Sequence, residues 1–221
     1  MPISKETYEE IVGKRIRYDI LYKYETAYRL IRKYKKGKLK ILDVGCGHGI
    51  FAFFADKNWI LYGIDLNKDR IEKAKKIKRK NVQFFLKNVE EFNLNKKVDV
   101  VLALDVIEHL DHPEKCIKLI SKNLNKNGVL IVSNPNRYST SNVLNNIVHL
   151  ENHKHYWSPK QFAEMVSKYG FKLIEVLPRP LFSEGIAWAI NDYRWFLNFD
   201  NKLGSLLPRF CTGWFLVFKK L

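Results

Sequence analysis

The sequence feature that most constrains the fold is a glycine-rich turn, DVGCGHG at residues 43–49, between two apolar segments. The segment before it, Leu39 to Val44, is a short apolar run typical of a buried strand. The segment after it, Ile50 to Lys57, is composed of helix-compatible residues. A strand, a tight glycine turn and a helix in this order predict the first unit of an α/β fold.

The same alternation continues along the chain and predicts a parallel sheet with helices on both faces. Further strands are expected where apolar runs are bounded by turn residues, at 59–64, 82–86, 98–104, 129–133, 171–177 and 214–218. Further helices are expected after the capping residue Asn67 and at 113–123, 143–150, 159–169 and 186–199. Apolar residues from Val12 to Tyr34 recur every three or four positions and predict one helix that continues through Gly13.

The composition fits a single folded domain. Of the 221 residues, 46% are hydrophobic, which excludes a disordered chain. Three cysteines without metal-type spacing favour a reducing compartment and no disulfide framework. The amino terminus is polar where a signal peptide would be apolar, and no apolar run is long enough to span a bilayer. We therefore expect a cytoplasmic protein without a transmembrane segment.

Positive charge is concentrated in two segments. The formal net charge is +16, and residues 1–40 and 66–80 together hold 13 of these excess charges. One interpretation is a solvated, lysine-rich surface of the kind found in thermophile proteins. The other is attraction to RNA phosphates or to an anionic membrane surface. The charge count alone does not choose between them.

An acidic residue follows the glycine turn at a sequence spacing that indicates the kind of ligand bound there. Asp65 lies 20 residues after Gly45, at the end of the next strand, where a carboxylate can accept both hydroxyls of a ribose. This spacing indicates a cofactor of the adenosine type. The glycines are spaced G-x-G-x-G rather than the G-x-G-x-x-G of dinucleotide sites. Asp43 would repel a phosphate but can hold an amino group, which further disfavours a dinucleotide.

Together with VDVVLALDVIEHLDHPEKC at 98–116 and LNKNGVLIVSNPN at 124–136, the turn resembles the class I S-adenosylmethionine-dependent methyltransferases over about residues 39–177. The resemblance implies a Rossmann-like α/β fold, with a seven-stranded, mostly parallel sheet of order 3-2-1-4-5-7-6 and the last strand antiparallel. It also implies the following organisation: an N-terminal helical lid at 1–37 and a methyltransferase domain at 38–221, with a variable substrate or lid insertion at 178–210.

The resemblance assigns S-adenosyl-L-methionine as the cofactor and implies which residues bind it. They are Asp43, Gly45, Cys46, Gly47, Gly49, Asp65, Leu66, Asn88, Val89 and Leu104. Asn88 departs from the family, which commonly has an acidic residue there. Its carbonyl oxygen can still accept a hydrogen bond from the adenine amino group.

The expected catalytic residues Asp105, Glu108 and His109 lie in the loop after the fourth strand, because open α/β sheets bind ligands at the carboxyl ends of their strands. Each could accept a proton from a hydroxyl group. With His153 they form a carboxylate and imidazole set able to bind a divalent metal. This layout is similar to that of the metal-assisted small-RNA terminal 2′-O-methyltransferases. In the alternative interpretation, Glu108 and His109 cap the helix at 113–123 and His153 anchors a loop.

The EHL-x-x-P and S-N-P-N stretches also resemble the ubiquinone-biosynthesis O-methyltransferases, although Asp105 stands where both families have Glu. The leading hypothesis is O-methylation of a small, partly apolar hydroxyl compound. RNA ribose or base methylation and a non-catalytic nucleoside-binding protein are the alternatives. A small-molecule acceptor is the expected partner, and RNA, peripheral membrane contact and a homodimer stay open.

Overall fold

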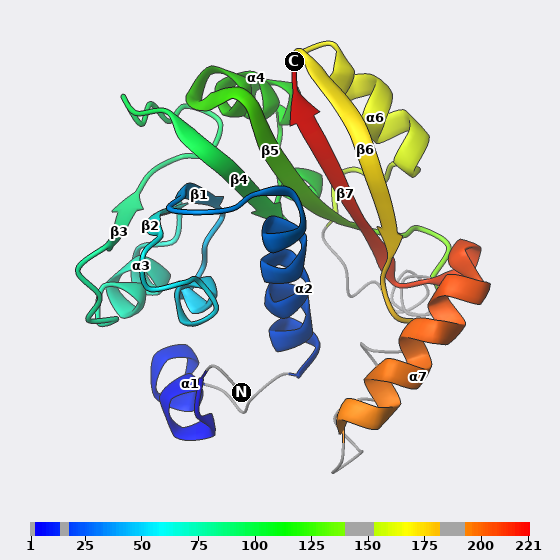
Figure 1. Cartoon of the computed structure of the whole chain (residues 1–221), viewed down its shortest axis with the longest axis horizontal. Helices are drawn as coiled ribbons and strands as arrows, with labels where there is room; N and C mark the ends of the chain where they lie inside the picture. The colour runs from blue at the N-terminus through cyan, green and yellow to red at the C-terminus, as the bar shows by residue number, and fades with distance from the viewer. Residues whose placement is uncertain (1–2, 14–17, 140–152, 182–192) are drawn as a thin grey trace.

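The computed structural model of the chain describes residues 3–13, 18–139, 153–181 and 193–221 (Figure 1). Within these residues the strands form one sheet in the order β3-β2-β1-β4-β5-β7-β6. The strands are β1 (Lys40–Val44), β2 (Ile60–Asp65), β3 (Val82–Leu86), β4 (Val98–Leu104), β5 (Leu124–Pro135), β6 (Phe171–Pro178) and β7 (Gly213–Lys220). β1 to β5 pair in parallel and β7 is antiparallel to both neighbours. The expected strand order and direction are confirmed.

Helices cover both faces of the sheet (Figure 1). The α-helices are α1 (Lys5–Val12), α2 (Tyr18–Tyr34), α3 (Lys68–Ala74), α4 (Pro113–Asn123), α6 (Pro159–Ser167) and α7 (Tyr193–Leu206). The described residues also form the short 3-10 helices η1 (Ile50–Phe53), η2 (Ile107–His109) and η4 (Pro208–Phe210). α2, η1 and α3 share one buried apolar cluster with the sheet, and α4 and α6 share the other.

The central strand β4 shows how the sequence directs this layering. Val101 and Ala103 belong to the cluster under α4 and α6, whereas Val100, Leu102 and Leu104 belong to the cluster under α2. Side chains alternate between the faces of a strand, so a continuous apolar run is what burial on both faces requires. The sheet therefore has an apolar core on each of its two faces.

The N-terminal helix differs from its prediction. Gly13 adopts a left-handed conformation with φ of 72°, and its N–H donates to the Glu9 carbonyl to end α1. The prediction of one helix through Gly13 is wrong, because glycine favours this helix-ending conformation. A small cluster containing Tyr8 and Ile11 of α1 then packs against Leu21 and Ile50.

The other helices differ less from their predictions. The helix expected at 50–57 is only the short η1, which begins directly after Gly49 in a left-handed conformation. Asn67 caps α3 as expected, since its side chain accepts from the Arg70 N–H. The helix expected at 143–150 and the first part of the helix expected at 186–199 lie outside the described residues. Within the described chain, no helix is both long and apolar enough to cross a membrane.

Candidate active site

The glycine turn lies at the carboxyl end of β1. The Ile64 carbonyl of β2 accepts from both the Gly45 and the Cys46 N–H, at 2.8 and 3.0 Å. A Cβ atom at Gly45 would lie 2.2 Å from a methyl carbon of the Val106 side chain, so only glycine fits at this position. At Gly47 a Cβ would meet nothing within 4 Å, so the turn opens onto free space. Such a turn allows close backbone approach to a ligand.

Asp65 is tied to this turn. Its two carboxylate oxygens accept from the Gly47 N–H at 2.9 Å and the Asn67 N–H at 2.8 Å. These bonds join the end of β2 to the turn after β1 and fix the carboxylate beside the opening at Gly47. The ribose-binding role expected of Asp65 is compatible with this position, because a carboxylate has further acceptor capacity.

Asp43 is buried at the end of β1, and its Oδ2 has no hydrogen-bond partner within the described part of the chain. Burial raises the pKa of Asp43 to about 7, against the opposing charge of Lys23 and with a further contribution from Asp65. A buried carboxyl group without a partner is unfavourable unless a ligand supplies one. A ligand ammonium group would be a suitable partner, because it favours the ionised form.

The other expected cofactor residues differ in their exposure and in their contacts. Leu66 is 69% exposed directly after β2, whereas Val89 and Leu104 are buried. Cys46 is also buried, which raises the pKa of its thiol. Asn88 uses its side-chain oxygen to accept from the Glu90 N–H at 3.0 Å, so it shapes the loop after β3. An adenine would have to share that oxygen.

Asp105, directly after β4, is held in an ion-pair network. One carboxylate oxygen accepts from Lys23 of α2 at 2.9 Å, and the other accepts from Arg179 at 3.0 Å and Ser133 of β5 at 2.6 Å. Burial alone would raise the pKa of Asp105, but Arg179 and Lys23 hold it well below its usual range. A lowered pKa favours the ionised form of this carboxylate, and both of its oxygens already accept hydrogen bonds, which suits orientation better than proton transfer.

Glu108 in η2 has the opposite character. It is 0% exposed, and neither carboxylate oxygen has a hydrogen-bond partner among the residues that the structure describes. Burial, with the negative charge of Asp105 added, raises the pKa of Glu108 to about 8. A carboxyl group whose pKa is shifted toward neutrality by burial is suited to accept a proton in a reaction.

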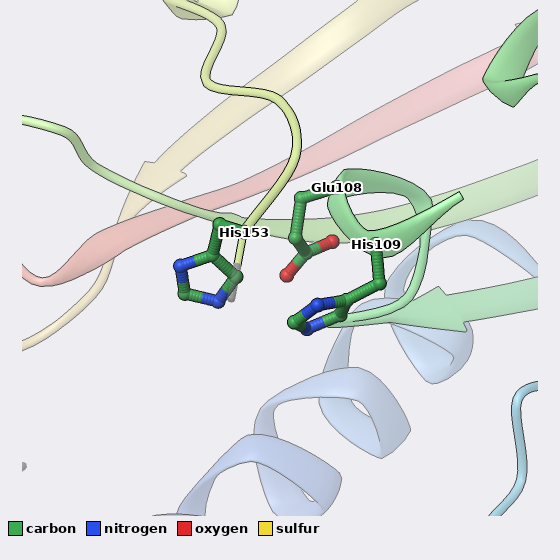
Figure 2. Close-up of side chains that lie close together, drawn as sticks. All are labelled: Glu108, His109 and His153. Atoms are coloured by element: carbon green, nitrogen blue, oxygen red, sulfur yellow. The ribbon is translucent and has the colours of Figure 1, made fainter. Parts of the chain in front are cut away.

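His109 and His153 lie beside Glu108, and Figure 2 shows the three side chains grouped around a common point. One ligand atom from each lies within 4.8 Å of the other two. The Glu108 carbonyl accepts from the Lys154 and His155 N–H groups, which holds the loop of His153 against η2. Two imidazoles and a carboxylate are a donor set that divalent transition metals accept.

The structure brings together only three of the four expected metal ligands. Asp105 takes part in the Lys23 and Arg179 network, and the metal-capable group contains the other three residues. The alternative that Glu108 caps the helix at 113–123 does not hold, since α4 begins after His112 with no side-chain cap. Sequence reasoning did not find Lys23, Ser133 and Arg179, which meet only through the fold.

Comparisons with known proteins place the chain among methyltransferases. A family model described as "Methyltransferase domain" matches residues 16–176. A ubiquinone biosynthesis O-methyltransferase of Rickettsia canadensis is 30% identical over 63% of this chain and 65% of the relative. One from Rickettsia prowazekii is 26% identical over 80% of this chain and 76% of the relative. The chain spans 65% and 40% of the length of the first two curated relatives it matches.

Solved structures share the fold at low identity. A SAM-dependent methyltransferase from Archaeoglobus fulgidus matches with a TM-score of 0.67 and 20% identity, over 96% of this chain and 97% of its own. Magnesium protoporphyrin IX methyltransferase from Synechocystis, solved with bound SAH, matches with a TM-score of 0.65 and 16% identity, over 98% and 94%. At these identities the likeness concerns the fold alone.

Proposed function

The chain belongs to the family of methyltransferase domains, as an S-adenosylmethionine-dependent enzyme, and from this premise we propose that it methylates a hydroxyl oxygen of a small, partly apolar compound. The observation that carries the proposal is the buried Glu108 carboxyl group, which has no hydrogen-bond partner in the described part of the chain and lies next to His109 and His153. It lies at the same edge of the sheet as the glycine turn. The curated O-methyltransferase relatives support the choice of an oxygen acceptor.

We propose that the cofactor lies along the carboxyl ends of β1, β2 and β3. The unpartnered Oδ2 of Asp43 and the open space at Gly47 fit this group. Asp43 would face the cofactor's ammonium group, and Asp65 would accept from the ribose hydroxyls. The cofactor-binding residues of this proposal are Asp43, Gly45, Cys46, Gly47, Gly49, Asp65, Leu66, Asn88, Val89 and Leu104.

The protein's part in the reaction is alignment and the removal of one proton. When bound, S-adenosylmethionine would supply a sulfonium methyl group, and the neutral thioether would be its leaving group. Glu108, in its ionised form, would accept the proton of the acceptor hydroxyl as the oxygen takes the methyl group. Asp105, fixed by Lys23 and Arg179, orients the loop that carries Glu108.

We further propose a divalent cation at Glu108, His109 and His153, where it would lower the pKa of the acceptor hydroxyl. The donor types and the unpartnered Glu108 oxygens fit such an ion. Calorimetric titration of the chelator-treated protein with Mg²⁺, Mn²⁺ and Zn²⁺ tests this part. One of them is expected to bind at a single site that His153→Ala removes. If none of the three releases or absorbs heat, Glu108 acts as a base without a metal.

Substitution of Glu108 tests the function itself. We expect the wild-type protein to form S-adenosylhomocysteine from S-adenosylmethionine when hydroxybenzenes are supplied as acceptors. Glu108→Gln should lower this rate by about 10²-fold or more, which is the contribution typical of a general base. Glu114→Gln, in an exposed residue of α4, is the matched control and should keep the rate. A Glu108→Gln protein with the wild-type rate would contradict the proposal.

A further inference from the structure

The His153 imidazole has two ring nitrogens, and only one of them lies on the side of Glu108. Figure 2 shows Nε2 of His153 directed toward Glu108 and His109, and Nδ1 on the far side of the ring. One ligand atom from each of these three side chains lies within 4.8 Å of the other two. The hydrogen bond made by one ring nitrogen decides whether the other nitrogen carries a hydrogen. The partner of Nδ1 therefore decides what Nε2 can do beside Glu108.

The backbone that follows His153 is held against η2 by several hydrogen bonds. The Glu108 carbonyl accepts from the Lys154 and His155 N–H groups at 2.9 and 3.1 Å. Nε2 of His155 donates to the Leu110 carbonyl at 3.0 Å. These bonds fix the loop, but they leave the torsion between Cβ and the His153 ring free, and this torsion has broad minima in histidine. The orientation of the ring therefore depends on contacts of the side chain itself.

Tyr156 provides such a contact. Its hydroxyl oxygen lies 3.2 Å from Nδ1 of His153, and the two rings meet edge to face, with centroids 5.5 Å apart and planes at 86°. The centroid of the His109 ring lies 4.7 Å from that of His153. His153 and Tyr156 are both half-buried, which strengthens a hydrogen bond relative to one in water. The imidazole thus has a hydrogen bond at Nδ1 and a ring contact with each neighbour.

We propose that Tyr156 is a positioning residue, which accepts the hydrogen of Nδ1 and so leaves the lone pair of Nε2 directed at Glu108. The inference rests on the proposed cation at Glu108, His109 and His153, and it identifies the residue that prepares one ligand for it. A phenol oxygen can accept as well as donate. Neutral imidazole with its hydrogen on Nδ1 can bind a cation through Nε2, whereas the other tautomer cannot. Metal-binding histidines usually donate their other N–H, and loss of the partner weakens metal binding by about 10- to 100-fold.

Tyr156→Phe tests the proposal, because it removes the hydroxyl group and keeps the ring. The full-length, chelator-treated proteins are titrated calorimetrically with Zn²⁺, without cofactor or acceptor. The Kd for Zn²⁺ should rise about tenfold or more in Tyr156→Phe. Tyr169→Phe is the matched control: Tyr169 is also half-buried and donates to Glu114 of α4 at 3.4 Å, and its variant should keep the wild-type Kd.

The tautomer of His153 is a readout that a merely structural role of Tyr156 would not change. Long-range ¹H–¹⁵N NMR of the metal-free protein at pH 8, where an ordinary imidazole is neutral, reports which nitrogen carries the hydrogen. The spectrum of His153→Ala identifies the signals of His153. The wild type should carry the hydrogen on Nδ1. Tyr156→Phe should populate both tautomers, because the hydrogen bond that selects one of them is lost.

The outcomes separate this inference from the proposed function. Hydrogen on Nε2 of His153 in the wild type, or an unchanged tautomer in Tyr156→Phe, overturns the positioning role. Equal, measurable Zn²⁺ affinities of these two proteins overturn it as well. If Zn²⁺ does not bind the wild type but the tautomer shifts as expected, the cation fails and the positioning role stands. Neither measurement needs an acceptor, so an absence of methyl transfer counts against the proposed function alone.

Discussion

Asp43 has a buried carboxyl group, and its Oδ2 has no hydrogen-bond partner among the residues that the structure describes. Its pKa, raised to about 7 by burial, means that the folded state holds a proton that the unfolded chain releases near pH 4. The native state binds more protons than the unfolded state across this window. The contribution of Asp43 to stability therefore falls as pH rises from about 4 to about 7.

Asp43→Asn should remove this pH-dependent penalty and weaken cofactor binding. At pH 8 the variant without ligand should melt at least ~2 °C higher than the wild type, and at pH 4 the difference should vanish. The wild type should bind S-adenosylhomocysteine more tightly as pH rises from 6 to 8, because the ionised carboxylate pairs with the ligand ammonium. The variant should bind about tenfold more weakly at pH 8, without this pH dependence.

Thermal melts and calorimetry between pH 4 and pH 8 provide both measurements. Glu72→Gln, in an exposed residue of α3 beyond its first turn, is the control and should change neither quantity by a comparable amount. Equal affinity of the Asp43→Asn protein and the wild type at pH 8 would place the cofactor ammonium elsewhere.

At the scale of elements, apolar runs proved more informative than helix periodicity. The expected strands at 82–86 and 98–104 match β3 and β4 at both ends, because each run is bounded by polar turn residues. The first helix was predicted less well, since period alone did not show that Gly13 would end it. The helix expected at 50–57 was predicted too long, because the residues after Gly49 have propensities compatible with a longer helix. Helix propensity is a weak predictor, and tertiary structure can override it.

The loop that carries His153 is followed by the capping box of α6. The Ser158 hydroxyl accepts from the Gln161 N–H, and the Gln161 side chain accepts from the Ser158 N–H. Ser158→Ala should lower the free energy of unfolding by about 1 kcal/mol, as loss of an N-cap does. Urea unfolding measures it, and Ser167→Ala, at the exposed C-terminal end of the same helix, should change it by less than ~0.5 kcal/mol.

Positive charge is the main property of the molecule as a whole, and it bears on the RNA alternative. A net charge of +16 attracts polyanions without sequence selectivity. We expect a 20-nucleotide RNA to bind weakly, with an affinity that falls at least tenfold between 50 and 300 mM NaCl. On the proposed function this RNA accepts no methyl group from radiolabelled S-adenosylmethionine. Transfer of label to RNA would replace the small hydroxyl compound as the substrate class.

The sequence predicted the glycine turn and the acidic loop after β4 because the residues of each are neighbours in the chain. Glu108 and His109 are adjacent, and the spacing from Gly45 to Asp65 is a local signal of one strand, turn and helix. The partners of Asp105 could not be predicted. Lys23 is one of many lysines, and Arg179 follows β6, 74 residues away, with no motif around it.

The Asp105 network ties together a lysine from α2, a serine from β5 and an arginine from the end of β6. During synthesis on a ribosome these groups emerge in that order, and the arginine comes last. The nascent chain can complete the first five strands while one carboxylate oxygen of Asp105 still lacks its guanidinium. The loop after β4 therefore gains its last ion pair only after residue 179 has left the exit tunnel.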